Sequence, residues 1–190
     1  MIDKSVPYIP FVMKRDACKP IPEYELPKGY RYVFYSPGDE KDWAGIETSV
    51  LEFDCEMDAL LYFQDGFLSH KGEAERRCFF IETDNGEKIA NSAAWWAYTG
   101  TRRDPIVHWV AVKPDYQGKG LGKAIVSKTL KLLVEIEGDR DFYLSTQTNS
   151  HTAVFIYEWA GFVISGEKGL IGKKNDEYDK AVAFINSKRK

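Results

Sequence analysis

Residues 105–136 read PIVHWVAVKPDYQGKGLGKAIVSKTLKLLVEI and predict a strand, a glycine loop and a helix, in that order. Residues 106–112 are almost entirely apolar, which is typical of a strand buried on both faces in the middle of a sheet. Pro114 ends this strand because it has no N–H to donate to a ladder. Three glycines then alternate within residues 117–123, where a missing side chain lets the backbone come close to a ligand.

The predicted helix after the glycine loop is amphipathic. Its apolar face carries Leu121, Ala124, Ile125, Leu132, Leu133 and Ile136. Lys123 lies opposite this face, and Lys128 interrupts it. The first turn of such a helix has N–H groups without backbone partners and the positive end of the helix dipole. The loop and the helix together therefore predict an anion site.

Two common phosphate-binding motifs do not fit this loop. A Walker loop has Ser or Thr directly after its Lys, whereas Ala124 follows Lys123 here. A dinucleotide fingerprint has its third glycine one residue later, and it needs an acidic residue after the next strand that this sequence lacks. A nucleotide-binding module is therefore disfavoured.

The loop resembles instead the coenzyme A pyrophosphate loop of the GNAT N-acetyltransferase superfamily. The shared pattern is Gln-x-x-Gly-x-Gly, preceded by Val-x-Pro and followed by an amphipathic helix. The matching residues are Val112, Pro114, Gln117, Gly118, Gly120 and Gly122. A second stretch resembles the family's Ala-x-x-x-Tyr-x-x-x-Gly-Phe helix through Ala153, Tyr157, Gly161 and Phe162. Two motifs in this order, with a strand between them, are more specific than either alone.

The resemblance implies roles for two side chains. Tyr157 would be the general acid for the departing thiolate, with a core tyrosine as the structural alternative. His108 is the only polar side chain in the apolar strand and is the candidate base, directly or through a bound water. Its structural alternative is a buried histidine that donates to a backbone carbonyl.

The resemblance also implies where acetyl-CoA binds, as a co-substrate and without a metal. The N–H of Val110 would polarise the thioester carbonyl, and Val112 would pair with the pantetheine amides. The family's usual Asn is replaced by Ser150, so the neighbouring Asn149 is the preferred contact. The residues expected to bind the cofactor are Val110, Ala111, Val112, Gln117, Gly118, Lys119, Gly120, Leu121, Gly122, Lys123 and Asn149.

Composition limits the remaining classes of function. The 190 residues are 44% hydrophobic and carry a net charge of −3, which suits one packed domain and argues against a general nucleic-acid binder. Cys18, Cys55 and Cys78 fit neither a disulfide framework nor a metal site. The sequence shows no leader after Met1 and no apolar run near ~18 residues, so we expect a cytoplasmic protein without membrane contact.

The whole pattern predicts an α/β (α+β) fold, with a mixed, mostly antiparallel sheet of about seven strands and helices on both faces. This is also the element order of the GNAT fold. Strands are expected at residues 30–35, 78–81, 89–98, 106–112, 142–144, 162–164 and 181–185. Helices are expected at residues 39–50, from the cap residue Asp54 onward, at 121–136, and from the cap residue Ser150 to Ala160 before Gly161.

Other stretches lie between or before these elements. Residues 1–29 hold five of the eight prolines, so we expect an extended arm without regular structure, packed on a domain of residues 30–190. Residues 84–87, Asp-Asn-Gly-Glu, predict a hairpin in which Asn and Gly both take positive φ. A glycine- and lysine-rich loop is expected at residues 166–175. The pair Trp95 and Trp96 fills a core or forms the wall of a pocket.

Acidic residues gather in the first two helices: Glu47, Glu52, Asp54, Glu56, Asp58 and Asp65. A solvated helix face is the ordinary interpretation, and a negative rim that attracts a cationic amine is the alternative. The sequence thus favours an acetyl-CoA-dependent N-acetyltransferase that acts on a primary amine of a small molecule, by direct attack in a ternary complex. A peptide or protein amine as acceptor, and a non-catalytic acyl-CoA sensor, are the alternatives. The oligomeric state stays open, with a homodimer among the possibilities.

Overall fold

A seven-stranded sheet organises the chain in the computed structural model, which describes residues 2–166 and 177–189. The strands are β1 (Pro10–Arg15), β2 (Tyr30–Phe34), β3 (Cys78–Thr83), β4 (Lys88–Thr99), β5 (Arg102–Val112), β6 (Phe142–Gln147) and β7 (Val163–Ile164). They lie side by side in the order β2-β3-β4-β5-β6-β1-β7. Only β5 and β6 run parallel among these neighbours, so the predicted mixed, mostly antiparallel sheet is confirmed.

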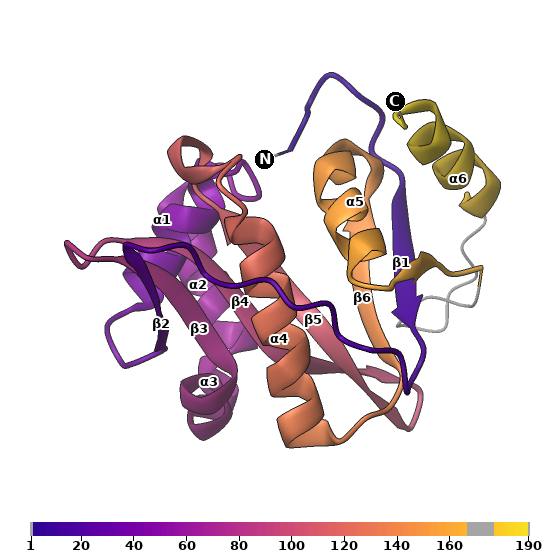
Figure 1. Ribbon diagram of the computed structural model, residues 1–190. Helices are drawn as coiled ribbons and strands as arrows, with labels where there is room; N and C mark the ends of the chain where they lie inside the picture. The colour runs from indigo at the N-terminus through magenta and orange to yellow at the C-terminus, as the bar shows by residue number, and fades with distance from the viewer. Residues whose placement is uncertain (1, 167–176, 190) are drawn as a thin grey trace.

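Helices cover both faces of the sheet (Figure 1). They are α1 (Glu40–Ser49), α2 (Glu56–Gly66), α3 (Lys71–Arg77), α4 (Leu121–Glu137), α5 (His151–Trp159) and α6 (Tyr178–Ser187), with short 3-10 turns at Leu68–His70, Pro114–Tyr116 and Thr148–Ser150. Helices α4 and α5 pack on one face, and α1 and α2 pack on the other. The helix α3 was not predicted from the sequence.

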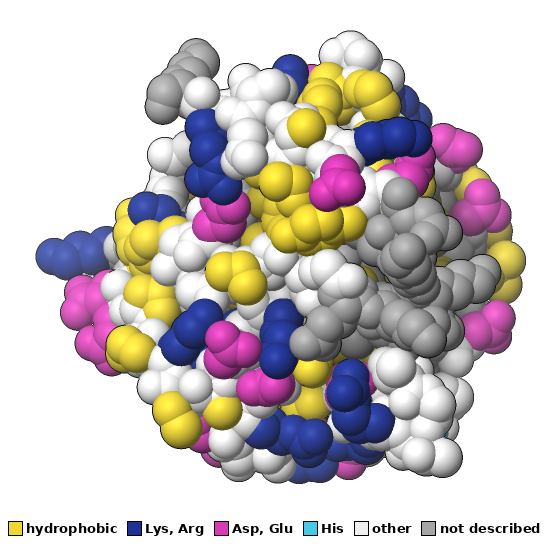
Figure 2. Space-filling model, turned by 90° about the vertical axis from the view of Figure 1, so that its right-hand side faces the viewer, with side chains coloured by type: hydrophobic (Ala, Val, Ile, Leu, Met, Phe, Trp, Pro, Cys, Tyr) yellow, Lys and Arg dark blue, Asp and Glu magenta, His cyan; other side chains and the backbone are white. Residues whose placement is uncertain are grey.

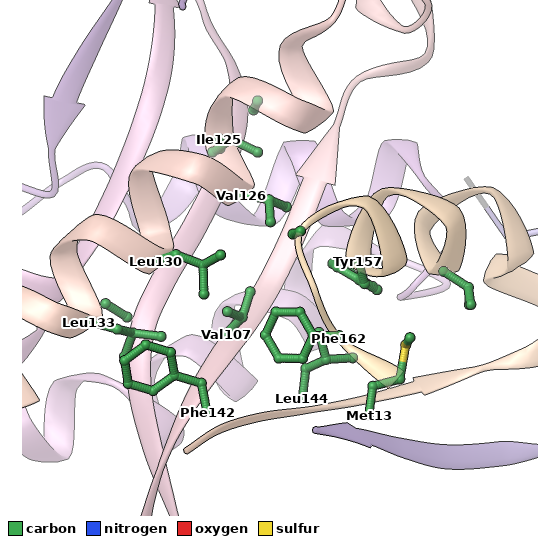
Figure 3. Packing of buried hydrophobic residues seen from close by; sticks show 14 of the residues in the cluster. Met13, Val107, Ile125, Val126, Leu130, Leu133, Phe142, Leu144, Tyr157 and Phe162 are labelled. Carbon is green, nitrogen blue, oxygen red and sulfur yellow. The ribbon is translucent and has the colours of Figure 1, made fainter. Parts of the chain in front are cut away.

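The two faces of β5 contribute to two different cores, as the continuous apolar run predicts. Val107 belongs to the core under α4 and α5, together with Leu130 and Phe142 (Figure 3). Its neighbour Ile106 belongs to the core under α1 and α2, together with Phe63. Because β5 is buried on both sides, the segment that follows it is held firmly at one end of the sheet.

The N-terminal arm contains a strand that the sequence analysis did not predict. Strand β1 lies between β6 and β7 and pairs antiparallel with both. Pro10 is its first residue, the one position in a strand where a proline costs little, and the next proline is Pro20. Phe11, Met13 and Arg15 alternate into the interior, and Arg15 Nε donates to the Ala160 carbonyl at 3.0 Å. Five prolines in residues 1–29 thus do not exclude a strand between them.

The predicted strand at residues 181–185 is wrong, because this segment lies within helix α6. Ala181 and Ile185 are fully buried while Ala183 is exposed, which is a helical spacing of four rather than an alternation of two. A run of five mostly apolar residues does not distinguish a short strand from a helix. The predicted loop at residues 166–175 lies outside the described residues apart from Gly166.

The hairpin between β3 and β4 forms where predicted, but with a different turn. Gly86 takes positive φ (+85°), whereas Asn85 does not. The Gly86 N–H donates to the Thr83 carbonyl at 2.9 Å, which makes a three-residue loop that ends in a left-handed glycine. The predicted cap of α2 is wrong, because Cys55 rather than Asp54 is its N-cap residue. Ser150 is the N-cap residue of α5 as predicted, but its side chain makes no capping hydrogen bond. Gly161, at φ +92°, ends α5 as expected.

The tryptophan pair packs in the core under α1 and α2 and does not form the wall of a pocket. The rings of Trp95 and Trp96 are stacked 4.4 Å apart, and Arg103 lies over the Trp96 ring at 4.6 Å.

At the surface, Lys and Arg are interspersed with Asp and Glu on the side of the molecule drawn in Figure 2. This side is consistent with the small net charge of the whole chain.

We predict that Met13→Ala lowers the free energy of unfolding by about 2–5 kcal/mol, because Met13 is fully buried between β6 and β7. Urea denaturation monitored by tryptophan fluorescence measures this value. Tyr8→Ala is the matched control, since Tyr8 is also in the arm but is 65% exposed. Equal effects of the two substitutions would contradict the placement of β1 in the sheet.

Candidate active site

Strands β5 and β6 separate, and a cavity lies between them. Ile106 and Tyr143 are the one registered pair between the two strands in the part of the chain that the structure describes. Beyond this pair, residues 107–112 of β5 and residues 145–147 of β6 line a cavity of about 700 Å³. Its other walls come from residues 2–4, Glu47, Val50, Glu52, residues 116–118, 121–122, Val126, residues 150–153, Ile156 and Tyr157.

A β-bulge at Trp109 shapes the floor of this cavity. Asn91 pairs with Ala111 and Ala93 pairs with His108, so β5 has one more residue than β4 between these pairs. Trp109 takes φ +48°, a conformation that is strained for a bulky residue. The bulge therefore reverses the alternation of side chains along β5.

As a result of the bulge, two consecutive side chains lie on the α1 and α2 side of the sheet. The Trp109 ring lies 5.3 Å from the Trp43 ring, and the His108 ring lies 5.9 Å from the Phe67 ring. The side chain of Asn91 donates to the Trp109 carbonyl at 2.8 Å. This hydrogen bond satisfies a carbonyl that the bulge removes from the ladder.

The glycine loop presents open backbone amides at the other end of the cavity. Gln117 Nε2 donates to the Val112 carbonyl at 2.8 Å, which ties the loop to the end of β5. The N–H groups of residues 118–122 donate to no acceptor within residues 2–166 and 177–189. Gly118 has φ +76°, and a Cβ there would meet nothing within 4 Å. This arrangement can accept an anion at the start of α4.

The other two glycines of the loop accommodate protein side chains. Gly120 takes φ +83°, and a Cβ there would collide with the ring of Tyr24 from the arm. A Cβ on Gly122 would lie 2.8 Å from Ile156 Cδ1, so this glycine lets α5 approach α4 closely. Only Gly118 of the three leaves open space where a ligand can approach.

Two predicted lysines lie over aromatic rings and are not part of the cavity lining. Lys123 Nζ lies 5.0 Å from the Trp159 ring centre, and Lys119 Nζ lies 4.8 Å from the Tyr116 ring centre. The lining includes the predicted residues His108, Val110, Ala111, Val112, Gln117, Gly118, Leu121, Gly122 and Tyr157, but not Lys119, Gly120, Lys123 or Asn149.

Asn149 and Ser150 lie at the junction of β6 and α5. The Asn149 carbonyl accepts from the Asp3 N–H at 2.8 Å, and its side-chain Oδ1 is buried without a hydrogen-bond partner among the described residues. Ser150 lines the cavity, and its Oγ accepts from Gln147 Nε2 at 3.2 Å. The geometry therefore leaves both residues as candidates for a ligand contact.

Tyr157 lies on α5 and faces the sheet near Phe162 (Figure 3). Its side chain is 7% exposed and lines the cavity, and its hydroxyl has no hydrogen-bond partner in the described part of the chain. Burial raises the pKa of this hydroxyl, and the nearby carboxyl groups of Glu52 and Glu47 raise it further. Tyr157 therefore keeps its proton at neutral pH, and the raised pKa makes it a weaker acid than an exposed tyrosine.

His108 is half-buried and lies between the rings of Phe67 and Trp109. Burial lowers the pKa of its imidazole to about 4, since the charged form loses its hydration. The ring is therefore neutral at pH 7, but it is a weak proton acceptor because its conjugate acid is strong.

Sequence reasoning missed Glu47 as an individual site residue. Its side chain is 1% exposed and lines the cavity, whereas Asp54, Glu56, Asp58 and Asp65 are exposed. The signal was present, because Glu47 follows Trp43 by four residues and so lies on the buried stripe of α1. Glu52 also lines the cavity, and its carboxylate accepts from Gln147 Nε2 at 3.4 Å.

Within the described residues, no group of three His, Cys, Asp or Glu side chains is arranged to hold a metal ion. Over the same residues, every helix is too short or too polar to cross a bilayer.

Comparisons with known proteins point to one family. A profile described as an acetyltransferase (GNAT) domain matches residues 74–164. The chain is 30% identical over 146 residues to the mycothiol acetyltransferase of Streptomyces coelicolor, a match that covers 75% of this chain and 46% of that protein. It is 37% identical over 59 residues to the spermine/spermidine N(1)-acetyltransferase of Bacillus subtilis, covering 31% of this chain and 39% of that protein. The chain thus spans less than half the length of these two relatives.

The fold is also found in solved structures. A solved GCN5-related N-acetyltransferase from Sphaerobacter thermophilus superposes with a TM-score of 0.65 at 19% identity, over 83% of this chain and 49% of that chain. The matched profile also covers β5, the glycine loop, α4 and α5, which form much of the cavity lining. Residues 74–164 are therefore an acetyltransferase domain of the GNAT superfamily.

Proposed function

We propose that this protein is an acetyl-CoA-dependent N-acetyltransferase that acetylates a primary amine of a small molecule. One observation carries the proposal: a single cavity joins the open amides at the start of α4 to the buried hydroxyl of Tyr157. A sensor of acyl-CoA would need the amides, but it would have no use for a phenol inside the cavity.

In this proposal, the diphosphate of acetyl-CoA binds the N–H groups of residues 118–122. The negative oxygens replace the missing acceptors and lie at the positive end of the α4 dipole. The pantetheine arm then extends between β5 and β6, where Val112 supplies backbone partners for its amides. The N–H of Val110, beside the bulge, polarises the thioester carbonyl. Asn149 or Ser150 contacts the arm from the β6 side.

The amine attacks the thioester directly while both substrates are bound, so most of the rate enhancement comes from positioning. Tyr157 donates its proton to the sulfur as the C–S bond breaks. A thiol has a pKa of about 8.5, so the thiolate leaves readily and the acid contributes a modest factor.

Two observations support a small cationic amine as acceptor. The cavity lining includes the side chains of Asp3 and Glu52, whose carboxylate forms attract an ammonium group. Two relatives are named for mycothiol and for spermine and spermidine, which are small molecules.

Gly118→Ala should weaken acetyl-CoA binding by about tenfold or more, because it strains the backbone at φ +76° and adds a methyl group beside the open amides. Isothermal titration calorimetry measures the dissociation constant. Gly86→Ala is the matched control, since Gly86 has φ +85° with equally open surroundings but lies in the β3–β4 hairpin. Unchanged affinity in Gly118→Ala would contradict the diphosphate site.

Tyr157→Phe should lower kcat about 10²-fold while leaving the affinity for acetyl-CoA unchanged, because only the proton donor is lost. The assay measures release of free CoA thiol with spermine, spermidine and 2-phenylethylamine as acceptors. Tyr98→Phe, on an exposed tyrosine of β4, serves as the control. Full activity of Tyr157→Phe would exclude the general-acid role.

The lowered pKa of His108 predicts a pH dependence of stability. The unfolded chain takes up a proton near pH 6.5, whereas the folded protein does so only near pH 4. Folded stability therefore falls as the pH drops from 6.5 to 4. His108→Gln should reduce this loss, and His70→Gln, on an exposed histidine, should not. Urea denaturation at pH 7.5 and pH 4.5 tests this, and identical slopes for both variants would mean that His108 titrates normally.

A further inference from the structure

Glu47 is the one carboxyl group that α1 buries against the sheet. We propose that Glu47 is the catalytic residue that accepts the proton from the acceptor amine. This inference rests on the proposed function, and it assigns to α1 the role that the sequence suggested for His108. Three features carry it: the way the carboxyl group is held, its place beside the bulge, and the chemistry of its surroundings.

A single hydrogen bond holds the Glu47 carboxyl group and leaves one oxygen open. Asn91 Nδ2 donates to Glu47 Oε1 at 2.7 Å. Oε2 has no hydrogen-bond partner in residues 2–166 and 177–189, and the side chain lines the cavity. A carboxyl group with one hydrogen bond still has acceptor sites to fill, and a donor on a ligand can fill them. The arrangement therefore presents Oε2 to a donor that enters the cavity.

The same amide group ties Glu47 to the bulge. Asn91 Nδ2 also donates to the Trp109 carbonyl at 2.8 Å, so one side chain bridges the carboxyl group and the backbone directly before Val110. In the proposed reaction, the Val110 N–H holds the thioester carbonyl. Glu47 thus lies beside the carbon that the amine attacks, on the α1 side of the sheet.

The surroundings of Glu47 suit a proton acceptor at neutral to mildly basic pH. Burial raises the pKa of Glu47 to about 8, even though the Asn91 hydrogen bond lowers it. A carboxylate with this pKa is a far better base than His108, whose pKa is about 4. The other titratable groups that line the cavity are Asp3, Lys4, Glu52, His108, Tyr116, His151 and Tyr157.

The proton transfers balance over one turnover. The acceptor enters as an ammonium ion and loses its first proton to water. The neutral nitrogen attacks the carbonyl carbon, and the Glu47 carboxylate takes the second proton as the C–N bond forms. The C–S bond breaks with its electron pair on sulfur, and Tyr157 protonates the thiolate. Water in the cavity returns the proton from Glu47 to the Tyr157 phenolate, so the enzyme ends as it began.

The decisive variant is Glu47→Gln, which keeps the shape of the side chain and removes its basicity. We expect kcat for thiol release with spermine, spermidine or 2-phenylethylamine to fall about 10²-fold. The dissociation constant for acetyl-CoA should stay within about threefold of the wild-type value, because the diphosphate and pantetheine contacts are elsewhere. Glu56→Gln, an exposed glutamate in the first turn of α2, should keep full activity.

The pH profile separates a base from a structural residue. Wild-type kcat should rise with pH through about 8 and then level, whereas residual activity of Glu47→Gln should lack this inflection.

The pH dependence of folded stability tests the same group without any acceptor amine. The folded state keeps the Glu47 proton up to about pH 8, whereas the unfolded chain releases it near pH 4.3, so wild-type stability falls between these values. Glu47→Gln should remove that decline.

The outcomes are distinguishable. Wild-type protein that neither binds acetyl-CoA nor releases thiol with any of the three amines would overturn the proposed function, and the role of Glu47 with it. An active wild type whose Glu47→Gln variant keeps its kcat and its pH profile would overturn the role of Glu47 alone. Loss of acetyl-CoA affinity in Glu47→Gln would show that the residue shapes the coenzyme site instead of taking the proton.

Discussion

The separation of β5 from β6 beyond Ile106 is the constraint on which the rest of the structure depends. A buried strand must satisfy its backbone N–H and C=O groups, and β4 does so on only one edge of β5. On the far side of the gap, β6 is paired with β1, and Gly122 lets α5 pack tightly on α4 through Ile156. An extended ligand with its own amides is the natural partner for the open edge.

The bulge at Trp109 places a strained residue beside this gap. A bulky residue at φ +48° costs roughly 1–3 kcal/mol, which the surrounding rings and the Asn91 hydrogen bond must offset. The same hydrogen-bonding side chain holds a buried carboxyl group, Glu47, whose charge is itself costly to bury. The strained backbone at Trp109 and the buried Glu47 carboxyl group each destabilise the folded state. Because both occur at the same place, a functional explanation is favoured.

Local patterns explain what the sequence could predict. The apolar run of β5, the glycine loop and the period of α4 are each set by neighbouring residues, so the order of elements and the anion site could be inferred. The reversal of alternation at Trp109 could not, because a bulge depends on what β4 presents opposite it. The side chains that need Gly120 and Gly122 to be glycines are Tyr24 and Ile156, far away in sequence. The burial of Glu47 could be inferred from its spacing to Trp43, but its link to the bulge through Asn91 of β4 could not.

The proline-rich segment between β1 and β2 is extended but has a defined path over the domain. After β1 the chain crosses α4 as an extended strap (Figure 1), where the Pro22 carbonyl accepts from Ser127 Oγ at 2.9 Å, and then enters β2. The strap therefore connects the β6 side of the cavity to the opposite edge of the sheet. Prolines reduce the freedom of the unfolded strap, so ordering it costs less. Since the two sides of the cavity share only one registered strand pair in the described residues, this strap helps to fix the distance between them.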